Sequence, residues 1–137
     1  MRRSLAGAVA AAAVAVMTAG CFDVQSADLF LLTRTGPGSK LTMLVNDGGT
    51  IRCNGGKAKA ISNTSLITAR DLAENLATDA QNKLTIPDAP GSVYYYRIRL
   101  QQGTVSFPDR ASGSRKVLAQ AALFATQAAQ QDCGLSS

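Results

Sequence analysis

The stretch KLTMLVNDGGTIRC, residues 40–53, decides the fold. Leu41, Met43 and Val45 alternate with Thr42, Leu44 and Asn46, and such alternation predicts a β-strand with one face toward a core. Asp47-Gly48-Gly49 then supplies residues that accept positive φ angles, which is a hairpin signal. Residues 50–53 return as the partner strand and place a cysteine at its end.

Three further strands are expected on either side of this hairpin. Residues 28–34 (DLFLLTR) have strand length, and TGPGS at 35–39 must turn because two glycines flank a proline. SVYYYRIRL at 92–100 is the clearest strand in the chain, and residues 105–107 (VSF) pair back onto it. The chain therefore contains about five strands joined largely by short turns.

Two amphipathic helices complete the predicted elements. Residues 62–84 begin at a Ser62 or Thr64 cap, and residues 115–131 form the second helix. The segment 108–114 (PDRASGS) is expected to be a loop. The sequence predicts an α+β fold, a two-layer sandwich in which an antiparallel sheet of about five strands is covered by two helices, as a single domain over residues 28–137. The apolar stripes are Leu66, Ile67, Ala69, Leu72, Ala73, Leu76 and Ala80 in the first helix, and Val117, Ala121, Phe124 and Ala128 in the second.

The N-terminus is typical of an export signal. A positive head at Arg2 and Arg3 precedes the uncharged stretch 5–20, which ends in small residues. Sixteen helical residues would span roughly 24 Å, short of a hydrocarbon core about 30 Å thick. We therefore interpret residues 1–20 as a signal peptide rather than a membrane-spanning helix.

Thr18-Ala19-Gly20-Cys21 resembles the lipobox of bacterial lipoproteins, with Thr18 in place of the usual leucine. The resemblance implies cleavage between Gly20 and Cys21 and a diacylglycerol on the Cys21 thiol. Residues 21–27 would then form a lipidated tether at the extracytoplasmic face of the bacterial cell membrane. The alternative is an ordinary secretory signal, with Cys21 as a plain thiol.

The cysteine count agrees with a lipid on Cys21. Three cysteines are present, so assigning Cys21 to lipid leaves Cys53 and Cys133 to pair in an oxidising compartment. The chain has no histidine, and zinc sites need three or four ligands. We expect a disulfide, no metal and no cofactor.

The charge of the chain argues against nucleic acid as a partner. The formal net charge of +5 falls to +3 when Arg2 and Arg3 leave with the signal, and the remaining basic residues are scattered. An anionic membrane or wall polymer is a plausible neighbour for such a domain.

No catalytic constellation is recognisable, and we expect no enzyme activity. Serine and cysteine triads lack their usual base because the chain contains no histidine. Asp47, Asp88 and Asp109 fall in predicted turns, where aspartate is favoured because its carboxylate caps local backbone. The sole glutamate, Glu74, lies on the polar side of the first helix.

One candidate binding face stands out on the strand 92–100. Tyr95, Arg97 and Arg99 share the face opposite to Tyr96 and Ile98. One aromatic ring and two guanidinium groups can hold an anionic polymer, a lipid headgroup or the carboxylates of an envelope protein. The alternative is the ordinary solvated face of an antiparallel sheet.

Two classes of function follow. The first is a non-catalytic, lipid-anchored envelope domain that binds a partner or ligand at the outer face of the membrane; in its alanine- and glycine-rich style the chain resembles small lipoproteins of actinobacteria. The second is a serine protease inhibitor, because the order of elements is similar to that of the subtilisin-inhibitor family. That family braces its inhibitory loop with local disulfides, which are missing here, and residues 108–115 (PDRASGSR) are the candidate bait loop.

Overall fold

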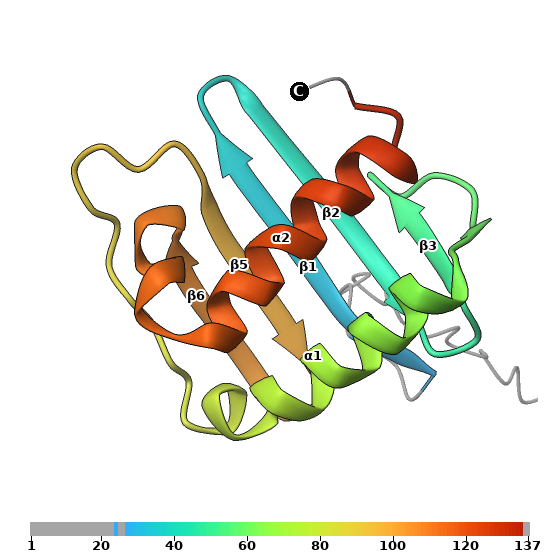
Figure 1. Ribbon diagram of the computed structural model, residues 1–137, viewed down its shortest axis with the longest axis horizontal. Helices are drawn as coiled ribbons and strands as arrows, with labels where there is room; N and C mark the ends of the chain where they lie inside the picture. The colour runs from blue at the N-terminus through green and yellow to red at the C-terminus, as the bar shows by residue number, and fades with distance from the viewer. Residues whose placement is uncertain (1–23, 25–26, 136–137) are drawn as a thin grey trace, which may run out of the picture.

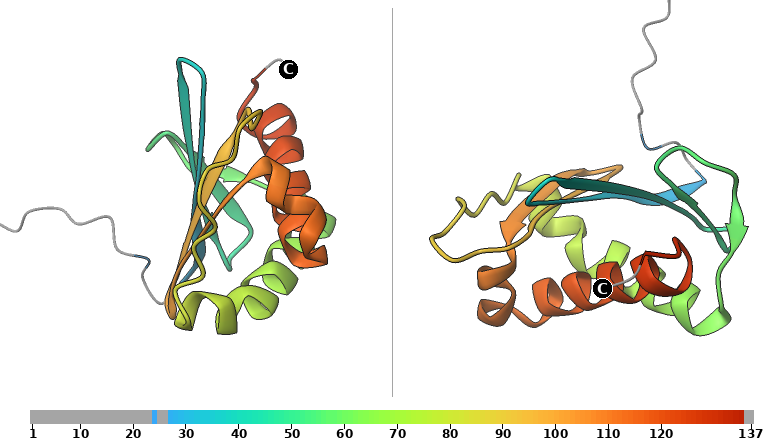
Figure 2. Two further views of the ribbon diagram at one scale, coloured as in Figure 1. Left: turned by 90° about the vertical axis from the view of Figure 1, so that its left-hand side faces the viewer. Right: turned by 90° about the horizontal axis from the view of Figure 1, so that it is seen from above.

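The computed structural model describes Val24 and residues 27–135, which fold into one sheet and two long helices. The sheet is antiparallel, with strand order β4-β3-β2-β1-β5-β6, and both helices cover the same side of it (Figures 1 and 2). The predicted α+β sandwich is therefore confirmed. The elements are β1 (Asp28–Gly36), β2 (Ser39–Asn46), β3 (Thr50–Cys53), β4 (Lys59–Ala60), α1 (Asn63–Gln81), β5 (Tyr95–Leu100), β6 (Gly103–Pro108), the 3₁₀ helix η1 (Asp109–Ser114) and α2 (Lys116–Gln131).

The central hairpin forms as its sequence predicts. Val45 of β2 pairs with Ile51 of β3, and both are fully buried. Asn46 closes the turn by accepting the backbone N–H of Gly48 at 2.8 Å, while Gly49 adopts a φ of 89°. Only glycine takes such a φ at no steric cost, so the turn fixes the register of the two strands.

The sixth strand, β4, is absent from the sequence prediction. It is two residues long and pairs with Thr50 and Ile51 at the edge of β3. The segment KAKA at 57–60 alternates lysine with alanine but has no large apolar or β-branched side chain, so little in the local sequence marks it as a strand. Its pairing is fixed by its neighbours, including the hydrogen bond from the N–H of Ile61 to the carbonyl of Gly49 at 3.0 Å.

The segment predicted as a loop at 108–114 instead has regular secondary structure. Pro108 ends β6 and is buried, and residues Asp109–Ser114 form η1. The Ser114 hydroxyl donates to the carbonyl of Ala111 at 2.7 Å. A single 3₁₀ segment of small polar residues has no hydrophobic period, so a loop prediction was wrong here for lack of any local signal.

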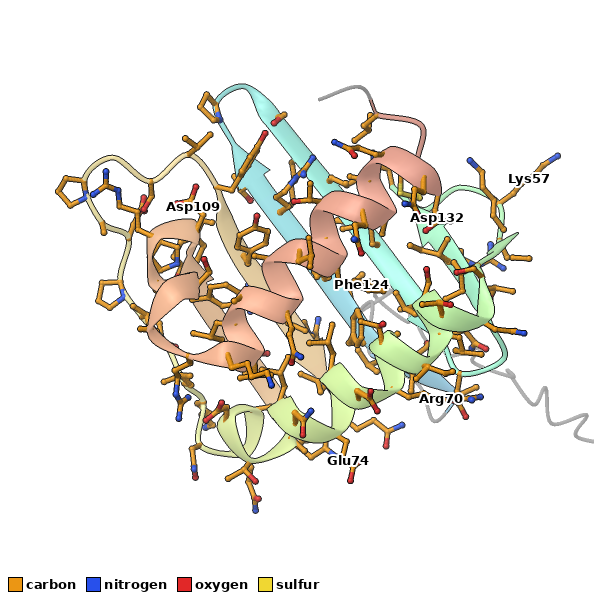
Figure 3. The ribbon with its side chains drawn as sticks, in the orientation of Figure 1. Lys57, Arg70, Glu74, Asp109, Phe124 and Asp132 are labelled. Carbon is orange, nitrogen blue, oxygen red and sulfur yellow. A yellow bond between two sulfur atoms is a disulfide. The ribbon has the colours of Figure 1, made fainter. Side chains whose placement is uncertain are left out.

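The core lies between the inner face of the sheet and the helices. The rings of Phe30 on β1 and Phe124 on α2 meet edge to face, with centroids 5.7 Å apart (Figure 3 labels Phe124). Tyr96 of β5 stacks on Phe107 of β6 at 5.2 Å. In α1 the fully buried stripe is Ala69, Leu72, Leu76 and Ala80, and in α2 it is Leu118, Ala121, Phe124, Ala125, Ala128 and Ala129.

The prediction that Ile67 belongs to the apolar stripe of α1 is wrong. The side chain of Ile67 is 58% exposed. Two residues along a helix are separated by about 200° of rotation, so Ile67 points away from the side that Ala69 occupies. The stripe is therefore narrower than predicted.

A disulfide joins the two layers at one end of the domain. Cys53 at the end of β3 bonds to Cys133, just beyond α2, with Cα atoms 5.7 Å apart. This is the pair that the cysteine count predicts. Nearby, the Lys59 ammonium donates to the carbonyl of Asp132 at 3.1 Å. Burial raises the pKa of the Asp132 carboxyl, and the charge of Lys59 partly opposes that rise.

The predicted signal peptide (1–20), the cleavage site at Gly20 and the lipid-bearing Cys21 lie outside the described residues. Within Val24 and residues 27–135, no helix combines the length and the apolar character needed to cross a membrane.

Candidate functional site

The two helices leave one side of the sheet without a helical layer, as both views of Figure 2 show. On β5, Tyr96 and Ile98 are buried beneath the helices, and the intervening side chains of Tyr95, Arg97 and Arg99 point to the opposite side. We call this side the outer face. By the same alternation it comprises Leu31, Thr33, Thr35, Lys40, Thr42, Leu44, Asn46, Thr50, Arg52, Tyr95, Arg97, Arg99, Thr104 and Ser106, and the strand register adds Asp28 opposite Asn46.

The strand register places the cations of the outer face in defined rows. Arg97 stands between Thr33 of β1 and Ser106 of β6. Arg99 is opposite Leu31, which is opposite Leu44, which in turn is opposite Arg52 of β3. Three strand spacings of about 4.8 Å separate these two arginines by roughly 14 Å. The outer face therefore holds an array of cations rather than a single charged point.

Lys40 adds a fourth cation to this array. It lies opposite Thr35 near the tip of the β1–β2 hairpin and is exposed. Sequence reasoning identified Arg97 and Arg99 because they share a strand, whereas Lys40 and Arg52 come from distant strands. Only the order of strands in the sheet shows that all four share one face.

Asp28 is the one acidic residue of the described strands that the register places on the outer face, opposite Asn46. Three acids lie on α1. Figure 3 shows one of them, Glu74, projecting from α1 at the lower edge of the view. Asp28 lies at the border of the face, at the start of β1, where it accepts a hydrogen bond from Asn46 at 3.0 Å. Four cations against one acid create a positive potential over this part of the surface.

The four cations differ in whether their side chains already interact with other residues of the chain. Arg52 donates to the carbonyl of Gly56 at 3.1 Å, and Arg99 also has a partner. Within the described part of the chain, the side chains of Arg97 and Lys40 make neither a hydrogen bond nor an ion pair, and both are exposed. These two side chains can therefore bind a ligand without breaking an existing contact.

Tyr95 has a structural role as well as a place on the outer face. Its hydroxyl donates to the carbonyl of Ile86 at 3.2 Å. Residues 84–86 run along the free edge of β6, where the N–H of Ile86 donates to Ser106 at 2.8 Å and the N–H of Ser106 to Leu84 at 2.9 Å. Tyr95 thus presents its ring rather than its hydroxyl to a ligand.

The aspartates predicted to cap turns do so or form ion pairs. Asp88 accepts the N–H of Ala89 at 2.9 Å, and Asp47 pairs with Arg70 at 2.7 Å. Asp109 accepts the backbone N–H groups of Val93 at 3.0 Å and Tyr94 at 3.2 Å. Burial by itself would raise the pKa of Asp109, but these hydrogen bonds and others hold it below its ordinary value of 3.8.

The pKa of Asp109 is lower in the folded state than in the unfolded state. The Asp109 carboxylate therefore stabilises the fold at pH values above its unfolded-state pKa. That contribution is lost as the pH falls through the folded value. We expect Asp109→Asn to reduce the loss of stability between pH 6 and about pH 3. Urea unfolding at both pH values measures this loss for each protein, with Asp88→Asn as control. An identical acid-side loss in Asp109→Asn and wild type would contradict the assignment.

The candidate bait loop at 108–115 is not irregular, although Arg110 and residues 113–115 are exposed as predicted. It begins at the buried Pro108, continues as η1, and ends at Arg115, whose guanidinium pairs with Asp79 at 2.8 Å. A largely exposed irregular segment lies at 87–92, between the β6 edge contact of Ile86 and the Asp109 contacts.

Two shallow hollows lie near the β5–β6 turn. The first, about 370 Å³, is bordered by acids that already have partners, namely Asp28 and Asp47, as well as by Glu74. The second, about 350 Å³, lies between Val24 and the turn and includes Arg99 and Thr104. Among the described residues, no three or more Asp, Glu, Cys or His side chains are grouped as a metal site would require.

Comparison with known proteins gives no relative: no family model matches the chain, and neither does any curated protein or solved structure.

Proposed function

We propose that this chain is a non-catalytic, lipid-anchored domain of the bacterial cell envelope whose outer face binds an anionic ligand at the extracytoplasmic side of the membrane. The observation that carries the proposal is the outer face itself, an uncovered sheet surface with four cations and one acid, Asp28, which lies at its border. Sheet faces that lack a covering layer are usually solvated, and the excess of positive charge is what distinguishes this one.

The lipid anchor is supported by the N-terminal residues and by the cysteine arithmetic. Thr18-Ala19-Gly20-Cys21 resembles a lipobox, and the bond between Cys53 and Cys133 leaves Cys21 as the odd thiol. We expect mass spectrometry of the native protein to find Cys21 as the first residue with a diacylglycerol mass, and Cys21→Ser to abolish it. A water-soluble product that begins at another residue would contradict the anchor.

The chemistry of the outer face suits phosphate or carboxylate oxygens. A guanidinium donates several hydrogen bonds in a plane, and an ammonium acts as a mobile point charge. Hydroxyls of Thr33 and Ser106 flank Arg97 on both neighbouring strands and add neutral donors. The ligand is therefore an anionic polymer, an anionic headgroup or an acidic protein of the envelope.

The pair Arg97→Ser/Lys40→Ser tests the face. Each cation near an anionic surface contributes about 1 kcal/mol, so loss of two should weaken binding to envelope material roughly thirtyfold at low salt. Co-sedimentation with isolated envelopes measures the affinity.

The matched control is Lys57→Ser/Lys116→Ser. It removes the same charge from two exposed residues outside the outer face, and Figure 3 shows Lys57 at the far edge of the domain. The control should bind nearly as wild type. Equal weakening by both pairs would mean that net charge, rather than this face, governs binding.

A second candidate function, serine protease inhibition, is favoured by the segment 87–92. It is largely exposed, carries Pro87 and Pro90, and is held at both ends by the contacts of Ile86 and Asp109. A rigid exposed segment loses little entropy when it binds a protease cleft. Incubation with a panel of serine proteases tests this, and the absence of inhibition at micromolar concentration would exclude it.

A further inference from the structure

We infer that the outer face lies flat on the bilayer that carries the lipid anchor, so that Arg97 and its neighbouring cations contact the phosphates of anionic phospholipids. The helices then form the side of the domain that faces away from the membrane. This inference rests on the proposed function and names its ligand as the anionic headgroup.

The first supporting observation is the position of Val24. It borders the hollow that also contains Arg99 and Thr104, two residues of the outer face. Cys21 precedes it by three residues, which span at most about 11 Å when fully extended. A lipid on Cys21 therefore draws this end of the outer face, rather than the helical layer, toward the headgroups.

The second observation is the two-dimensional spread of the cations. Arg99 and Arg52 lie on strands three positions apart, while Lys40 lies at the opposite end of the sheet from Val24. A single extended polymer would follow one row of such an array, whereas a bilayer presents anionic groups over a whole plane. Attraction to an anionic leaflet decays within a Debye length of about 8–10 Å, so the face must lie flat for all four cations to contribute.

The third observation disfavours a protein partner. Interface centres are enriched in aromatic side chains and are poor in charge. The centre of the outer face is the pair Leu31 and Leu44, both only half-buried, and the single aromatic, Tyr95, stands at the border with its hydroxyl used by Ile86. Cations on three sides of a small apolar centre suit a headgroup layer better.

The experiment compares two labelled positions in the full acylated chain. With Cys21 acylated and Cys53 bonded to Cys133, an introduced cysteine is the only free thiol. Thr35→Cys places a fluorophore on the outer face, seven residues and roughly 24 Å along β1 from Asp28. Gln120→Cys places it on the exposed side of α2. Energy transfer to a headgroup-labelled lipid reports the distance of each label from the bilayer.

The protein is reconstituted in vesicles of phosphatidylcholine and in vesicles of equal parts phosphatidylcholine and phosphatidylglycerol. We expect transfer from the Thr35→Cys label to exceed that from Gln120→Cys only in the anionic vesicles, and high salt to abolish the difference. Arg97→Ser/Lys40→Ser should also remove it, while Lys57→Ser/Lys116→Ser should keep it.

Equal transfer from the two labels in anionic vesicles, with the protein still floating with them, would overturn the flat orientation and leave the lipid anchor in place. Displacement of the Thr35→Cys label from the bilayer by added soluble wall polymer at physiological salt would likewise overturn it in favour of the polymer. Failure of the wild-type chain to float, together with a missing acyl mass, would overturn the proposed function itself.

Discussion

Replacing Gly103 with alanine is expected to destabilise the domain by roughly 2–5 kcal/mol, from overpacking and backbone strain together. Gly103 begins β6 with a φ of 151°, a conformation that residues with a Cβ rarely adopt. A Cβ built there would overlap the carbonyl oxygen of Ala80 and lie 2.9 Å from its carbonyl carbon. Ala80 is fully buried in the last turn of α1, so the helix cannot move aside without opening the core.

Gly113→Ala is the matched control for this substitution. Its Cβ would meet no atom within 4 Å, and its φ is not in the positive range. Urea unfolding followed by circular dichroism should give a much lower midpoint for Gly103→Ala and nearly the wild-type midpoint for Gly113→Ala. A change below 1 kcal/mol at Gly103 would show that the β5–β6 turn yields more easily than its packing against α1 indicates.

Loss of the disulfide is expected to cost about 4 kcal/mol, because the bond closes a long loop and restricts the unfolded chain. Cys53 and Cys133 are separated by 80 residues. The variant Cys53→Ala/Cys133→Ala should therefore unfold at a much lower urea concentration than the oxidised wild type. Reductant should lower the wild-type midpoint toward that of the variant.

The double variant is also its own control, because its midpoint should not respond to reductant. Hydrogen exchange should further show which elements open first when the disulfide is lost. The bond joins β3, the second strand of the sheet, to the end of α2, beside the contact of Lys59 with Asp132. We expect faster exchange in β4 and the last turn of α2 on reduction. A reductant-insensitive wild type would mean that the two thiols are not paired in the purified protein.

The sequence by itself determined the elements whose signal is local. Alternation in residues 41–46 and 95–100 marks β2 and β5, the strands on either side of β1, and assigns Arg97 to the face opposite the core, because side chains of a strand point alternately to its two sides. Helical periodicity located α1 and α2 to within a few residues, and the cysteine count indicated the pair 53 and 133. Each of these inferences depends on residues close in sequence or on simple counting.

Only the tertiary structure decided which distant residues share a surface. The strand order brings Lys40 and Arg52 onto the same face as Arg97, and the placement of both helices on one side leaves that face uncovered. The tertiary structure also shows that β4 pairs with β3, that residues 109–114 form η1, and that the carbonyl of Ile86 lies beside the Tyr95 hydroxyl. These features arise from pairing between segments far apart in the chain, where the local pattern carries no signal and the packing of the whole domain selects the arrangement.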